Sequence, residues 1–275
     1  MKKYKNPEEI YKKGLTGKES LLISALARQD KKIFNIEDTR SIIGRDAGKI
    51  MSSLIRKKWV LPLKRGLYAI VPLDVGFKGA DSFILHNFVI ASHLVEPYYI
   101  GYWSALNYYG FSEQIPRTTF IATTKARMPL NILAAYYCFI KLKKKKFFAF
   151  NKIDIEGWKI NIASPEKTIA DCLDRPEQTG GIDEVAKAVY FNHEEMDLRK
   201  IYGFAERMGN ATILKRLGYI LEATGLLDKY GDIFNRFSPS KGYPALDPVS
   251  ARKGRYNSKW GLLLNFKINP EGWMY

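Results

Sequence analysis

Three helical patterns followed by a hairpin pattern occupy residues 18–71, and this order constrains the fold more than any other feature of the chain. Thr16 and Glu19 form a capping box, in which a hydroxyl and a carboxylate three residues apart start a helix. Asn35 is placed to cap a second short helix, and Gly44 to end it, because the turn needs a residue that tolerates positive φ. A third helix is predicted from an apolar stripe at helical spacing, formed by Ala47, Ile50, Met51, Leu54 and Ile55.

A basic turn joins two β-rich runs directly after the third helical pattern. Residues 59–63 and 67–71 enclose Lys64-Arg65-Gly66, which predicts a hairpin with a doubly positive tip. Three helices and then a hairpin are the order of a winged helix-turn-helix, which we predict for residues 1–75. The alternative is a helical bundle with a solvated basic face.

The polar face of the third helix points to DNA as a partner. It carries Lys49, Ser52, Ser53 and Arg56. Basic and short hydroxyl side chains can reach phosphates and base edges in a major groove. Asp46 is placed as the N-cap of this helix, where its carboxylate need not repel the duplex.

The charge of the chain is concentrated in this N-terminal part. The 275 residues carry a formal net charge of +16, and their 46% hydrophobic content allows a sizeable core. Residues 1–75 hold 17 Lys and Arg against 8 Asp and Glu, or +9, whereas residues 76–275 hold 27 against 20, or +7. A basic chain can favour nucleic acid or an anionic membrane face, and here the motif favours nucleic acid.

Residues 76–275 predict a second, larger domain of mixed α/β type, so the whole chain is expected to be α+β. The segment 72–81 reads as a linker, a small sheet is expected at about 115–163, a helical region at about 164–225, and an irregular tail after Pro239. The pattern predicts helices over residues 83–94, 101–109, 164 onward, 182–191, 196–208 and 211–224, and strands over 117–123, 135–142, 147–150, 158–162 and 260–266.

Four consecutive lysines separate two of these predicted strands. Lys143, Lys144, Lys145 and Lys146 are expected at a hairpin tip. Such a tip can simply keep a sheet edge soluble, or it can add contacts to DNA or to a partner.

Sequence features that would place the chain in another compartment are lacking. Cys138 and Cys172 are far apart and form neither a disulfide framework nor a Cys-x-x-Cys metal pair, which fits a reducing compartment. The basic start lacks the apolar region of a signal peptide, and no apolar run approaches 18 residues. We therefore expect a cytoplasmic protein without a membrane span.

Candidate catalytic and metal-binding residues are few. His86 and His93 lack a nearby carboxylate or thiol. Asp154, Glu156 and Lys159 faintly resemble a metal-dependent nuclease cluster, but Glu156 and Lys159 have the spacing Glu-x-x-Lys instead of the usual Glu-x-Lys. Lys167 and Asp171 form an i, i+4 pair, which more often supports a helix than catalyses a reaction. We expect no enzyme activity, no catalytic residue, no metal and no cofactor.

An ordered series of short motifs resembles the AbiEi antitoxins of abortive-infection toxin–antitoxin systems of type IV. The resemblance covers residues from about 18 to 265 and rests on five segments, Arg65–Ala69, Pro97–Ile100, Ser104–Leu106, Tyr108–Gly110 and Ala163–Asp171. It implies an N-terminal winged helix-turn-helix that binds inverted repeats in the promoter and represses its operon. It also implies a C-terminal domain that neutralises a cognate toxin resembling a nucleotidyltransferase.

The resemblance extends the set of expected DNA-contacting residues. It implies contacts from Arg45 and the polar face of the third helix in the major groove, and contacts from the hairpin as the wing. With the adjacent lysine included, the expected set is Arg45, Lys49, Ser52, Ser53, Arg56, Lys57, Lys64 and Arg65. We expect a monomer in solution and several protomers on operator DNA, with direct toxin contact left open. The lysine run and the long tail depart from the family pattern.

Three other functions remain open from the sequence. The chain could be a ligand-responsive winged-helix regulator without a toxin partner, which binds a small molecule in the aromatic cluster at residues 97–103. It could be a DNA-acting enzyme that uses Asp154 and Glu156, or a binding module without a role on DNA.

Overall fold

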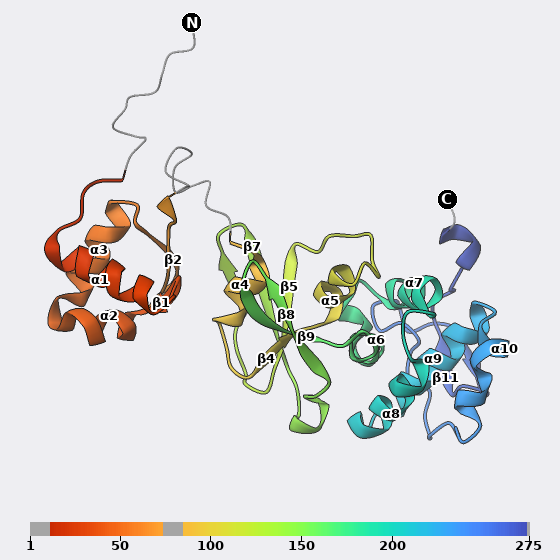
Figure 1. Ribbon diagram of the computed structural model, residues 1–275. Helices are drawn as coiled ribbons and strands as arrows, with labels where there is room; N and C mark the ends of the chain where they lie inside the picture. The colour runs from red at the N-terminus through yellow and green to blue at the C-terminus, as the bar shows by residue number, and fades with distance from the viewer. Residues whose placement is uncertain (1–11, 74–84, 274–275) are drawn as a thin grey trace, which may run out of the picture. The chain divides into compact units, whose positions relative to one another are not determined.

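The computed structural model describes residues 12–73 and 85–273 of the chain (Figure 1). The chain divides into two compact units, the first comprising residues up to His86 together with Ile132–Ala134, and the second comprising Asn87–Asn131 and Ala135–Tyr275. The predicted boundary between residues 75 and 76, and most of the predicted linker, lie outside the described residues.

The first unit contains three helices and a small antiparallel sheet. Thr16 and Glu19 form the predicted capping box, Asn35 accepts a hydrogen bond from the Asp38 amide as the second cap, and Gly44 has φ 75°. The order of the elements is α1 (Gly17–Arg28), β1 (Ile33–Asn35), α2 (Ile36–Ile43), α3 (Ala47–Arg56), β2 (Val60–Lys64) and β3 (Leu67–Ile70). The predicted helices and the predicted hairpin are therefore confirmed.

Strand β1 was not predicted, because three residues carry too little periodicity to be recognised. It pairs with β3, which gives the strand order β1-β3-β2. The apolar stripe of α3 meets the other helices in a core that contains Leu22, Leu26, Phe34, Met51 and Leu54.

Asp46 is the N-cap residue of α3, as predicted, but its side chain does not cap the helix. Its backbone is already helical, with φ −80° and ψ 0°, because it ends a 3-10 turn over Gly44–Asp46. Its side chain makes no capping hydrogen bond and pairs with Lys18 instead.

The second unit is built on a six-stranded mixed sheet. Its strand order is β6-β7-β5-β4-β9-β8. The β4/β5 and β8/β9 pairs are antiparallel, whereas β4/β9 and β5/β7 are parallel. The strands are β4 (Tyr98–Ile100), β5 (Thr118–Thr123), β6 (Leu130–Ile132), β7 (Ala135–Lys141), β8 (Phe150–Ile155) and β9 (Trp158–Ala163).

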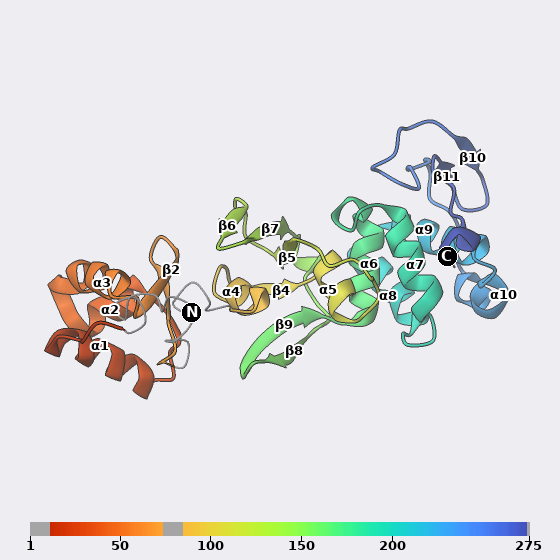
Figure 2. The same ribbon diagram turned by 90° about the horizontal axis from the view of Figure 1, so that it is seen from above.

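Helices complete the second unit, and all of them except α4 gather at one end of the sheet (Figure 2). Ser164 caps α6 as its spacing predicts, and α6 contacts α5, α7, α8 and α9. Two short strands, β10 (Arg255–Asn257) and β11 (Leu262–Leu264), pair in the tail. The helices are α4 (Asn87–Ser92), α5 (Tyr102–Tyr108), α6 (Pro165–Asp174), α7 (Ile182–Asn192), α8 (Leu198–Met208), α9 (Ala211–Ala223) and α10 (Leu227–Tyr230).

Two predictions for this unit are wrong. Helix α4 is shorter than the predicted 83–94, since its described flanks at Leu85–His86 and His93–Leu94 are not helical. The lysine run is not a hairpin tip, because β5, β4 and β9 lie between β7 and β8 in the sheet. Residues 142–149 instead form a crossing segment with a 3-10 turn at Lys144–Lys146, and no strand begins before Phe150.

Candidate nucleic-acid interface

Helix α3 presents a polar face on the side opposite to its buried stripe. Ala47, Met51 and Leu54 are buried, whereas Lys49 and Arg56 are exposed. This separation follows from the helical period, which places residues three and four apart on one face. The face is therefore open to a ligand.

Most acidic side chains of the first unit are paired with basic residues other than the exposed arginines of this face. Residues 12–73 hold 14 Lys and Arg against 5 Asp and Glu. Four of these five acids are in ion pairs, namely Lys18–Asp46, Lys31–Asp38 at 2.6 Å, Arg40–Glu37 at 2.6 Å and Lys57–Glu19 at 2.5 Å. Within the described part of the chain, Arg45, Arg56 and Arg65 form no ion pair, so their charge is available to a ligand.

Lys57 is placed differently from the other predicted DNA contacts. It is half-buried, pairs with Glu19, and donates to the Gly14 carbonyl at 2.9 Å. Burial acts to raise the pKa of Glu19, but Lys57, Thr16 and Ser53 stabilise the carboxylate and lower that pKa to about 2. The charge of Lys57 is thus used to hold α3 against α1, and Ser53 faces the same carboxylate.

No sequence pattern indicated this role for Lys57, since Glu19 lies 38 positions earlier in the chain. No short-range spacing rule connects the two residues. Only the buried position of Glu19, which is 1% exposed although it belongs to a capping box, would have indicated that it needs a cationic partner.

The β2–β3 turn carries the other predicted basic contacts. Arg65 is exposed, Lys64 is half-buried, and Gly66 has φ 81°. The strand register shifts between Pro62 and Lys64, next to the turn. Ser52 on α3 is exposed and donates to the Gly48 carbonyl at 3.0 Å, so its oxygen remains able to accept or share a further bond.

The lysine run lies in the second unit. Lys146 donates to both oxygens of Asp174 at 2.7 Å, and Asp174 also accepts from Asn210 at 2.6 Å. Lys143, Lys144 and Lys145 are exposed, and Lys145 lies beside Gly209. The four lysines therefore differ in environment, which their uniform sequence conceals.

The pair formed by Lys167 and Asp171 is buried rather than a surface support of its helix. Both side chains are 0% exposed. Tyr99 of β4 donates to Asp171 at 2.8 Å and lies 3.0 Å from the Lys167 ammonium. Burial raises the pKa of Asp171, while Lys167 and Tyr99 act against that rise. This network joins α6 to the central strand of the sheet.

The candidate nuclease residues Asp154 and Glu156 lie together in one hairpin. Asp154 lies in the β8–β9 hairpin, where it accepts from the Gly157 amide at 2.9 Å and from Lys159 at 3.0 Å. Glu156 is in the same turn, with φ 53°. Across residues 12–73 and 85–273, no three His, Cys, Asp or Glu side chains come together to hold a metal ion.

The aromatic cluster at residues 97–103 belongs to the core. Tyr99 and Tyr102 are fully buried, and Tyr99 stacks on Phe150 with ring centroids 5.4 Å apart. These rings stabilise the sheet, so their burial does not favour a small-molecule site there.

Among the described segments, none of the helices has both the length and the apolar composition required to cross a bilayer.

No family model matches the chain. A comparison with curated proteins finds no match either. Among solved structures, the chain is similar to the crystal structure of the RV2827C protein from Mycobacterium tuberculosis, with a TM-score of 0.67, 15% identity and 94% of each chain covered. At this identity the similarity concerns the fold alone, and it shows a shared α+β architecture over almost the whole of both chains.

Proposed function

We propose that the first unit is a winged helix-turn-helix that binds operator DNA, with α3 in the major groove and the β2–β3 turn as the wing. The observation that carries this proposal is the uncompensated positive charge on one face of the unit. Arg45, Lys49 and Arg56 project from or beside α3, while the nearby acids are paired with other basic residues. Exposed arginines without a carboxylate partner suit phosphates and guanine edges.

Binding of this type depends on salt, because each neutralised phosphate releases condensed counterions. With roughly 4 to 6 phosphate contacts per protomer, affinity should fall steeply as the salt concentration rises. Contacts from Ser52 and the arginines to base edges would add sequence preference. A repressor of its own operon would bind an inverted repeat through several protomers.

The test is a titration of the full chain on its own upstream region and on scrambled DNA, at two salt concentrations. The double variant Lys49→Ala with Arg56→Ala should weaken operator binding by about 2–4 kcal/mol, or roughly 30-fold to 1000-fold. The matched control removes Arg28 and Lys32, two exposed basic residues outside α3 that form no ion pair with another described residue. Unchanged affinity, or an equal loss in the control, would refute the assignment of α3.

We further propose that the second unit is an antitoxin domain that neutralises a nucleotidyltransferase-like toxin. Support comes from the resemblance of its motifs to the AbiEi antitoxins and from its own large core, which is separate from that of the first unit. If the two activities are divided in this way, the Lys49→Ala, Arg56→Ala variant should still protect cells from the toxin. Loss of protection in that variant, at equal expression, would contradict the division.

A further inference from the structure

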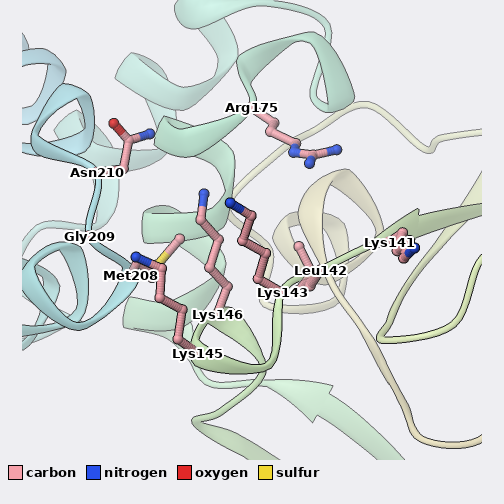
Figure 3. Close-up of a pocket in the computed structure, with 9 residues that line it drawn as sticks. All are labelled: Lys141, Leu142, Lys143, Lys145, Lys146, Arg175, Met208, Gly209 and Asn210. Atoms are coloured by element: carbon pink, nitrogen blue, oxygen red, sulfur yellow. The ribbon is translucent and has the colours of Figure 1, made fainter.

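A basic cavity of about 500 Å³ lies in the second unit, between the crossing segment and the ends of two helices (Figure 3). The crossing segment follows β7, and the helix ends are the C-termini of α6 and α8. The lining residues are Lys141, Leu142, Lys143, Lys145, Lys146, Arg175, Met208, Gly209 and Asn210. Five of these nine side chains are cationic and none is acidic.

Acidic compensation around this cavity is limited to one side chain among the described residues. Asp174 pairs with Lys146 at 2.7 Å and lies 4.0 Å from the Nε atom of Arg175. Lys141, Lys143 and Lys145 form no ion pair with any residue in the described ranges. The cavity therefore has a clear excess of positive charge.

Two of the five cations have structural roles. Lys146, together with Asn210, satisfies the buried carboxylate of Asp174. Lys145 lies against Gly209 at the C-terminus of α8, where the exposed helix carbonyls favour a cation. These contacts explain why a lysine stands at each position.

Lys143 and Arg175 are not explained in this way. Lys143 is exposed, and Arg175 has 39% of its side chain exposed and only a long contact to Asp174. Figure 3 shows Lys143 and Lys146 extending side by side toward the space between Arg175 and Asn210, whereas Lys141 lies apart. The charges of Lys143 and Arg175 are therefore available to an anionic ligand.

We propose that this cavity binds the phosphate chain of a nucleotide. Arg175 supplies a planar fork for two phosphate oxygens, and the exposed ammonium of Lys143 supplies a second positive charge. Leu142 and Met208 are buried and give the cavity an apolar wall. The volume of about 500 Å³ lies within the usual range of small-molecule sites. The site is independent of the DNA contacts proposed for the first unit.

The experiment is calorimetric titration of the full chain with inorganic tripolyphosphate, and then with ATP. The test variant is Lys143→Ala with Arg175→Ala. The matched control is Lys144→Ala with Lys152→Ala, which removes the same charge from two exposed lysines that do not line the cavity. Tripolyphosphate should bind once per chain, at least tenfold more weakly in the test variant, and within twofold of the wild type in the control.

A second variant separates this site from the first unit. Lys49→Ala with Arg56→Ala should leave tripolyphosphate binding unchanged, whatever it does to DNA binding. Tighter binding of ATP than of tripolyphosphate would further support a nucleotide as the ligand. Equal losses in the test and control variants would overturn the proposal, because they would show diffuse attraction. Binding of an oligonucleotide without tripolyphosphate binding would overturn it as well.

Discussion

The two units carry similar net charge, but basic side chains remain exposed in the first unit, whereas several are buried in the second. In the first unit, four acids pair with three lysines and one arginine, and other arginines without an ion pair among the described residues remain on the surface. In the second unit, Lys167, Lys215 and Arg216 are buried. A count of charges along a sequence therefore does not show how much of the charge can reach a ligand.

The buried cations of the second unit hold the tail against the helices. The ammonium group of Lys215 donates to the carbonyls of Ser240, Gly242 and Gly261 at 2.8–3.1 Å. Arg216 donates to three more carbonyls, those of Leu173, Ala245 and Leu246, at 2.6–3.0 Å. The segment with little regular secondary structure is thus fixed by two neighbouring residues of α9.

The largest effect is expected from breaking the buried network of α6. Asp171→Ala leaves the Lys167 ammonium without its carboxylate in the core, which should destabilise the second unit by about 3–5 kcal/mol. The measurement is chemical denaturation of the full chain, followed by far-ultraviolet circular dichroism.

A double variant sharpens this test. Lys167→Met with Asp171→Leu replaces the pair by apolar side chains and should recover most of the loss, since no charge is left buried. If the double variant is as unstable as Asp171→Ala, the packing of these side chains matters more than their charges.

A smaller effect is expected from acid on the first unit. The pKa of Glu19 is about 2 in the folded chain and 4.5 in its ordinary state, so its ionised form contributes about 3 kcal/mol to stability. This contribution is complete above pH 4.5 and is lost progressively as the pH falls toward 2. The protection factors of the α1 amides, taken against the intrinsic exchange rate at each pH, should fall over this range.

The control for the acid effect is Glu19→Gln, which has no charge to lose. In this variant the protection of α1 should be lower at neutral pH and should change less between pH 4.5 and 2. An unchanged pH dependence would mean that other carboxylates of the unit, such as Asp38, carry the effect.

The smallest effects are expected from the helix caps, where the two units should behave alike. Asn35→Ala in the first unit and Ser164→Ala in the second each remove a side-chain acceptor from a helix N-terminus. Each should cost about 1 kcal/mol, as measured by the denaturation midpoint. A much larger loss for Ser164→Ala would indicate that the start of α6 is coupled to the buried network.

Local patterns predicted the elements well and their pairing poorly. The capping residues Thr16, Asn35 and Ser164 start helices as expected, because a cap depends on neighbours within three residues. Strand order depends on contacts between distant segments, so the crossing path of Lys143–Lys146 was not predictable from its flanking strands. The pairing of Lys57 with Glu19 and the cavity beside Arg175 also depend on contacts between distant segments, so they were not predicted.

The strand order of the second unit also bears on the sequence of events during synthesis. Strand β4, at residues 98–100, pairs with β9, at residues 158–163, so the middle of the sheet cannot close until more than half of the chain has been made. The helices and strands of the first unit pair within residues 16–71. Because short-range contacts form faster than long-range ones, the first unit should take shape on the ribosome while the second is still incomplete.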